Sequence, residues 1–151
     1  MGAQAFDPKL IVYQIIALQC LYYLVEGGIL MGFNLIFGTD VSMTQIFTPK
    51  GLEVGSAEGL LNVMALLLSF VAGSVLLCVV VERAKKCLDF TVTLFFFHFL
   101  ACGVYESFPS TLLWWVCHLV GLSVMTLLGE HLCARSELRD IPLFVIDQTT
   151  G

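Results

Sequence analysis

The distribution of charged residues constrains this chain more than any other feature of its sequence. Two runs of 23 residues, at 59–81 and 107–129, contain no Asp, Glu, Lys or Arg. Two further runs of 16 residues, at 10–25 and 90–105, also contain no charged residue. A helix on the surface of a water-soluble protein carries charge on its outer face, so runs of this length exclude an ordinary soluble domain. The chain is therefore expected to be an integral membrane protein.

The lengths of these runs predict an all-α, integral membrane bundle of four transmembrane helices. About 20 apolar residues in an α-helix span a hydrocarbon core of about 30 Å. We expect the spans at about 10–30, 59–81, 88–105 and 111–129, within a single domain at 1–143 that a short C-terminal tail at 144–151 follows. Asp7-Pro8 is expected to start the first helix, Gly27-Gly28 to end or loosen it, and the last helix to continue to about Arg139.

The positions of Lys and Arg predict the orientation of this bundle. With four spans, both chain ends and the 82–87 turn lie on one side of the membrane. That side carries six basic residues, whereas the other carries Lys50 alone: Lys9, Arg83, Lys85, Lys86, Arg135 and Arg139. Cytosolic loops are enriched in Lys and Arg, so both termini are expected in the cytosol. Tyr105, Trp114 and Trp115 then fall at the luminal interface, where amphipathic rings prefer to lie.

Glu26 is the acidic residue inside the first apolar segment, and ionisable residues at membrane depth are candidates for function. Gln19, either Tyr22 or Tyr23, and Glu26 share one helix face, which is compatible with a small proton-coupled transporter. The simpler interpretation, which we prefer, is that Glu26 lies near the luminal interface and reaches water there. The net charge of −5 and the lack of a Lys/Arg cluster longer than three residues give no indication of a nucleic-acid partner.

Two histidines and two cysteines lie in the third and fourth spans: His98, Cys102, Cys117 and His118. Their spacing matches no metal motif, and adjacent residues point about 100° apart on a helix, so we predict no metal and no cofactor. His98 is instead expected to form a hydrogen bond between helices. A membrane enzyme that uses His98 and His118 is a third alternative, but no base–nucleophile spacing supports it, and we expect no enzyme.

Small residues predict where the helices pack together, and two cysteines are candidate modification sites. Ala65, Ser69 and Gly73 recur every four residues, and Gly121 and Gly129 are spaced by eight, so these stripes predict packing faces within the bundle. Cys87 and Cys133 lie next to the membrane on the cytosolic side, which makes both thiols candidates for reversible palmitoylation.

The second half of the chain carries a specific resemblance. Its motifs are KCLDFTVT at 86–93, Phe96-Phe97-His98, Phe108-Pro109-Ser110 before Trp114-Trp115, GEHLCARSEL at 129–138 and Ile141-Pro142-Leu143. With Asp7-Pro8, Gln14, Gln19 and Tyr22-Tyr23 in the first span, the chain closely resembles the Sys-one family of small four-span Golgi membrane proteins over residues 6–37 and 82–143.

This resemblance implies a non-enzymatic role in the trans-Golgi membrane. Members of the family recruit an ARF-related small GTPase with an acetylated N-terminus and support traffic between endosomes and the Golgi apparatus. Because the cytosolic turn and tail carry most of the charge, we take six of their residues as the hypothetical partner-binding rim: Lys85, Lys86, Asp89, Arg135, Glu137 and Arg139. The lipid bilayer is the other expected partner, and homo-oligomer formation is left open.

Overall fold

The fold of the chain is entirely helical over the part that the computed structural model describes, residues 7–48 and 52–139. In chain order the helices are α1 (Pro8–Phe37), α2 (Thr44–Phe47), α3 (Ala57–Val81), the 3-10 helix η2 (Ala84–Lys86), α4 (Cys87–Tyr105) and α5 (Leu112–Arg139). Four segments are long and apolar enough to cross a membrane, namely Pro8–Phe37, Ala57–Val81, Ala84–Tyr105 and Leu112–Arg139. The all-α fold class with four candidate spans is confirmed, whereas the expected tail at 144–151 lies outside the described residues.

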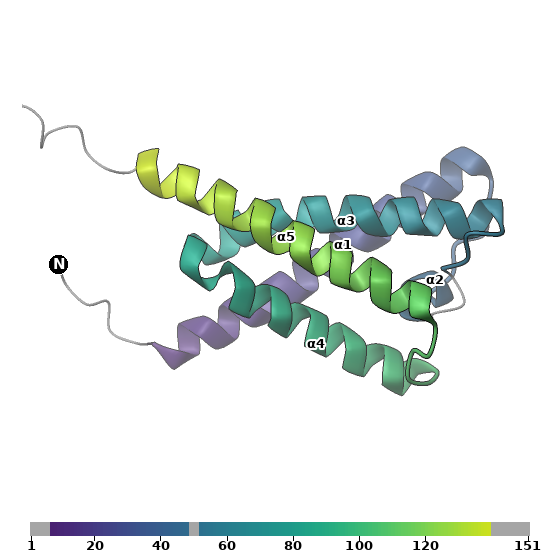
Figure 1. Ribbon diagram of the computed structural model, residues 1–151, viewed down its shortest axis with the longest axis horizontal. Helices are drawn as coiled ribbons and strands as arrows, with labels where there is room; N and C mark the ends of the chain where they lie inside the picture. Colours follow the sequence, from purple (N-terminus) through teal and green to yellow (C-terminus); the bar gives the residue numbers. More distant parts are fainter. Residues whose placement is uncertain (1–6, 49–51, 140–151) are drawn as a thin grey trace, which may run out of the picture.

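The four long helices run side by side and alternate in direction (Figure 1). α3 packs against both α1 and α5, and α4 packs mainly against α5. The start of α1, the end of α5 and η2 lie at one end of the bundle, which we call the terminal end. The opposite end, here called the loop end, carries α2, the described connecting residues 38–43 and 52–56, and the turn between α4 and α5. The bundle therefore places the start of α1 and the end of α5 at the same end, as four predicted spans require.

The beginning of α1 follows the sequence prediction, but its end does not. The Asp7 side chain accepts hydrogen bonds from the backbone N–H groups of Lys9 and Leu10 at 3.0 and 3.5 Å, and Pro8 takes the first helical position. The helix then continues through Gly27-Gly28 and ends at Gly38, whose φ of 70° is left-handed. The expectation that Gly27-Gly28 end or loosen the helix is therefore wrong.

The physical reason lies in the surroundings of these glycines. Glycines are common inside transmembrane helices, where no water competes for the exposed backbone. Gly38 is different because its left-handed backbone lets the Gly38 N–H bond to the Asn34 carbonyl and so cap the helix. The 30 residues of α1 give a rise of about 45 Å, which exceeds a hydrocarbon core of about 30 Å and carries the helix end beyond it.

Small residues bring α3 and α5 into close contact. Ala65 and Ser69 are fully buried, and a Cβ atom added at Gly73 would lie 3.0 Å from the end of the Met125 side chain. On α5, a Cβ atom at Gly121 would overlap the ring of Phe70. In lipid, helices associate through such close packing rather than through apolar burial, so the prediction that the stripes are packing faces within the bundle is confirmed.

The aromatic residues expected at an interface have different surroundings. Trp114 lies in the first turn of α5, but it is 1% exposed, so its ring packs in the core instead of facing lipid or water. Trp115 is half-buried, and its Nε1–H donates a hydrogen bond of 3.0 Å to the Pro109 carbonyl. Tyr105 is exposed at the loop end. The adjacent tryptophans therefore hold the α4–α5 turn onto the bundle, and this packing decides the burial of Trp114.

Candidate functional site

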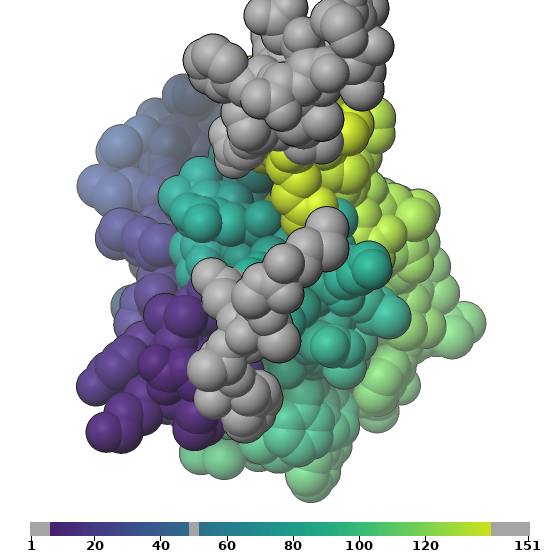
Figure 2. All heavy atoms as spheres, turned by 90° about the vertical axis from the view of Figure 1, so that its left-hand side faces the viewer, coloured from purple at the N-terminus to yellow at the C-terminus, as the bar shows by residue number. Residues whose placement is uncertain are grey.

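The six residues of the hypothetical rim lie in three elements that meet at the terminal end: η2, the first turn of α4 and the last turns of α5. The Glu137 carboxylate accepts a hydrogen bond of 3.0 Å from the backbone N–H of Ala84, which joins α5 to η2 across 53 positions of the sequence. Figure 2 looks onto this end, where the start of α1, the 82–87 region and the end of α5 lie next to one another. We call these six residues the terminal rim.

Most side chains of the terminal rim are exposed and can therefore contact a partner protein. Five of the six are exposed, and Lys86 is half-buried. Beside Lys85, a shallow groove runs between η2 and α5 and combines apolar with charged side chains. Its lining residues are Ala84, Lys85, Leu127, Glu130, His131 and Ala134.

Sequence reasoning missed the groove residues Leu127 and His131. Leu127 is 68% exposed and reads, from the sequence, like any other lipid-facing leucine. His131 carries no signal beyond its place in the 129–138 motif, and only the fold of η2 against α5 brings it beside Ala84 and Lys85.

Cys87 and Cys133 face each other instead of facing the membrane surface. Their Sγ atoms are 3.5 Å apart, and both residues are 0% exposed. An acyltransferase needs an accessible thiol, so palmitoylation of Cys87 or Cys133 requires these side chains to leave this contact, and it stays a prediction. Both are free thiols that pack the start of α4 against α5, beside Gly129, where an added Cβ atom would lie 3.0 Å from the Leu77 side chain.

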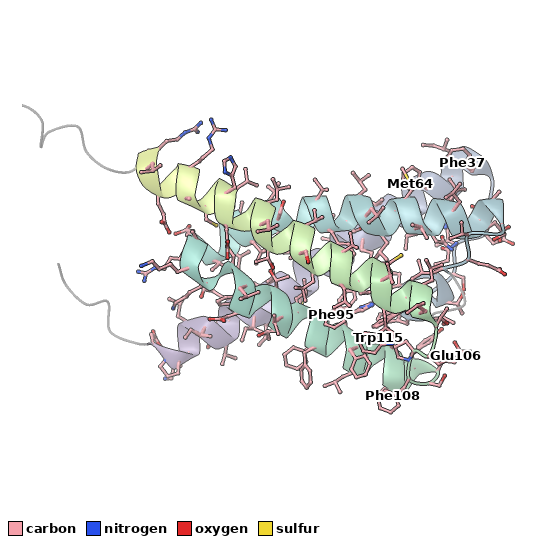
Figure 3. All side chains as sticks on the ribbon, in the orientation of Figure 1. Phe37, Met64, Phe95, Glu106, Phe108 and Trp115 are labelled. Atoms are coloured by element: carbon pink, nitrogen blue, oxygen red, sulfur yellow. The ribbon has the colours of Figure 1, made fainter. Side chains whose placement is uncertain are left out.

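The histidines form the centre of an aromatic cluster toward the loop end. Nδ1 of His98 lies 3.0 Å from the Tyr23 hydroxyl of α1, which confirms the predicted hydrogen bond between helices. The rings of His98 and His118 are stacked at 5.2 Å, and the rings of His118 and Trp114 at 3.9 Å. Figure 3 shows Phe95 and Trp115 between α4 and α5, beside this cluster.

The described contacts of the two histidines are with aromatic, hydroxyl, thiol and carbonyl groups. The Cys102 thiol lies 3.5 Å from Nε2 of His98, whose other nitrogen faces the Tyr23 hydroxyl, and Nδ1 of His118 lies 2.8 Å from a backbone carbonyl. Across residues 7–48 and 52–139, no group of three or more His, Cys, Asp or Glu side chains is placed to hold a metal ion.

Glu26 lies inside the bundle, which corrects the preferred sequence interpretation that it reaches water at an interface. The buried face of α1 consists of residues spaced by four: Leu18, Tyr22, Glu26, Leu30 and Asn34. Glu26 is 3% exposed and lines a small cavity together with Trp114 and His118 of α5. Because α1 continues for three more turns beyond Glu26, this carboxyl group lies within the packed bundle and not at its rim.

Comparisons with known proteins agree with this architecture. The family model SYS1, described as "Integral membrane protein S linking to the trans Golgi network", matches residues 1–143. The chain is 42% identical over 139 residues to a SYS1 homolog from Dictyostelium discoideum and 37% identical over 136 residues to one from Nematostella vectensis. These matches cover 92% and 90% of the chain, and 60% and 87% of the respective relatives. No solved structure matches the chain.

Proposed function

Because the chain belongs to the SYS1 family of integral membrane proteins of the Golgi apparatus, we propose that it is a receptor that recruits an ARF-related small GTPase to the trans-Golgi membrane. In this role it supports traffic between endosomes and the Golgi apparatus and performs no chemical reaction. The proposal places both termini and the terminal rim in the cytosol, where such a GTPase is available.

The observation that supports this proposal is the way the terminal rim is assembled. η2 and the end of α5 are joined by the bond between Glu137 and Ala84, so the exposed charges of both elements are presented together. The adjacent groove offers the exposed apolar side chain of Leu127 between charged neighbours. A protein–protein interface needs this combination of an apolar contact and a polar border.

A small GTPase needs such a receptor because its own attachment to the membrane is weak. A single weak membrane anchor gives only marginal and reversible binding to lipid, and stable attachment requires a second signal. A receptor that spans the bilayer supplies this second signal. It also selects the organelle, because the GTPase then remains only on membranes that contain the receptor.

The orientation of the bundle is part of the proposal and has its own test. Lys9, Arg83, Lys85, Arg135 and Arg139 are all exposed at the terminal end, in agreement with a cytosolic placement. Epitope tags fused to the two chain ends in intact Golgi vesicles should be digested by protease added from outside. Tags that become digestible only after the membrane is opened would contradict the proposed orientation.

The rim itself is tested by charge reversal in the reconstituted protein. The triple variant Lys85→Glu, Arg135→Glu and Arg139→Glu should weaken GTPase binding to receptor-containing liposomes about tenfold, at roughly 0.5 kcal/mol for each exposed charge. The control variant Glu58→Lys reverses an exposed charge at the loop end and should leave binding unchanged. Unchanged binding of the triple variant would exclude these three rim charges from the interface, and loss of binding by Glu58→Lys would place the partner at the loop end.

The alternative function, a small proton-coupled transporter, rests on one observation. Glu26 is buried in the bundle and lines a cavity with His118, as the carboxyl group of a proton-coupled site would. Proton-driven substrate uptake into liposomes that is lost in Glu26→Gln and kept in Glu58→Gln would favour this function. Uptake that is absent from the unaltered protein would exclude it.

A further inference from the structure

Two hollows lie one behind the other at the loop end of the bundle. The outer hollow is open, has a volume of about 700 Å³, and is lined by polar and acidic side chains: Asp40, Ser42, Thr44, Gln45, Thr48, Glu58, Asn62, Tyr105 and Glu106. Figure 3 shows Glu106 at this end. The inner cavity lies deeper, between α1, α3, α5 and the α2 region, and shares Gln45, Thr48 and Asn62 with the outer hollow. These three shared side chains therefore lie where the inner cavity and the outer hollow adjoin.

Three polar side-chain atoms of the inner cavity are buried without a partner. They are Oε2 of Glu26, Oγ1 of Thr48 and Nε2 of His118, and none of them has a hydrogen bond to residues 7–48 or 52–139. The three side chains are 3%, 4% and 3% exposed, and all of them line the inner cavity. Buried polar atoms are almost always paired in folded proteins, so three unpaired atoms around one cavity indicate a missing partner.

The hydrogen-bonding roles of these atoms follow from their other contacts. Nδ1 of His118 lies 2.8 Å from the backbone carbonyl of Trp114, and a carbonyl only accepts. Nδ1 therefore carries the proton, and Nε2 of the neutral ring is an acceptor. Oε2 of Glu26 is buried without a partner and accepts through its lone pairs, whereas the hydroxyl of Thr48 donates or accepts. The cavity thus offers two acceptors and one hydroxyl that is free to donate.

We propose that the inner cavity is a binding site for one ordered water molecule, held by Glu26, Thr48 and His118. The water donates its two protons to Oε2 of Glu26 and Nε2 of His118 and accepts the proton of the Thr48 hydroxyl. The cavity leaves about 10 Å³ for the centre of a water molecule, which is about the room that one water needs. The outer hollow supplies this water past the shared polar side chains.

This water connects three parts of the chain that are distant in sequence. Glu26 belongs to α1, Thr48 follows α2 in the loop-end connection, and His118 belongs to α5. The site therefore fastens the loop-end connection to the interior of the bundle. The water also forms a hydrogen bond with the buried carboxyl group of Glu26, which lowers the free-energy cost of burying this group among apolar side chains.

The first test compares two identical substitutions of buried threonines. Thr48→Val removes the hydroxyl that binds the water, so the thermal unfolding midpoint of the full chain should fall by about 2–4 °C. Thr126→Val is the matched control, because Oγ1 of Thr126 is also buried and unpartnered but does not line the inner cavity. The midpoint of Thr126→Val should stay the same or rise. A midpoint for Thr48→Val that is unchanged or raised would show a dry cavity and overturn the proposal.

The second test detects the water in the unaltered protein. In lipid bilayers, solid-state nuclear magnetic resonance with ¹⁵N-labelled histidine should show magnetisation transfer from bound water to Nε2 of His118, which the variant His118→Gln assigns. The ¹⁵N shifts should also show a ring protonated at Nδ1 alone. Absence of transfer to this nitrogen, with transfer still observed at the exposed His131, would refute the water site.

Discussion

The close contact between α3 and α5 makes Gly121 sensitive to a small substitution. A Cβ atom at Gly121 would overlap three carbons of the Phe70 ring. The ring has little freedom to move away, because its centroid lies 6.2 Å from that of Tyr22 and 5.9 Å from that of His118. In Gly121→Ala the two helices must therefore separate or the aromatic cluster must shift.

The magnitude follows from two opposing effects. Inserting a methyl group into a packed core costs about 1–3 kcal/mol, whereas replacing glycine by alanine within a helix gains about 1 kcal/mol. Gly28→Ala isolates the second effect, because a Cβ atom at Gly28 of α1 meets nothing within 4 Å. The free energy of unfolding of Gly121→Ala should therefore be about 1–3 kcal/mol below that of Gly28→Ala.

The assay is reversible unfolding in mixed detergent micelles, followed by the fluorescence of Trp114 and Trp115. A second variant identifies the atoms that collide. Phe70→Leu shortens the obstructing side chain, so the double variant with Gly121→Ala should be more stable than the sum of the two single changes predicts, by about 1 kcal/mol. Equal free energies for Gly121→Ala and Gly28→Ala, or strictly additive effects in the double variant, would refute the proposed contact.

Three further predictions concern single hydrogen bonds. Asp7→Ala removes the cap of α1 and should lower the free energy of unfolding by about 1 kcal/mol in the same assay, whereas Asp7→Ser should restore most of it. Tyr23→Phe removes the bond to Nδ1 of His98 and should cost about 0.6–1.7 kcal/mol; a neutral result would mean that this ring nitrogen has another partner. Trp115→Phe loses the bond to the Pro109 carbonyl and should cost about 1 kcal/mol, with faster hydrogen exchange in the α4–α5 turn as the local readout.

Several parts of the molecule follow from the sequence because their causes are local. Runs without charge predict the four long helices, and the helix start at Asp7-Pro8 depends only on neighbouring residues. The small residues at 65, 69 and 73 predict the face of α3 that packs within the bundle, because only small side chains permit such an approach.

The candidate sites were harder to predict, because they are formed by residues that are far apart in the sequence. The terminal rim was expected from its charges, but the bond between Glu137 and Ala84 and the groove at Leu127 exist only because α5 folds back onto η2. The burial of Cys87 against Cys133 could not be inferred from their positions near the membrane. The two residues are 46 positions apart in the sequence, and only the packing of α4 against α5 brings their thiols into contact.

The sequence by itself determined that this protein consists of apolar helices long enough to cross a bilayer, and its motifs determined the family. Only the tertiary structure decided that Glu26 is buried inside the bundle and lines one cavity with His118 and Thr48. The physical reason is that a helix in lipid is apolar both on the face that packs and on the face that meets the hydrocarbon. Hydrophobic periodicity therefore does not identify the inward face, and the partners of a buried polar residue are known only once the helices are packed together.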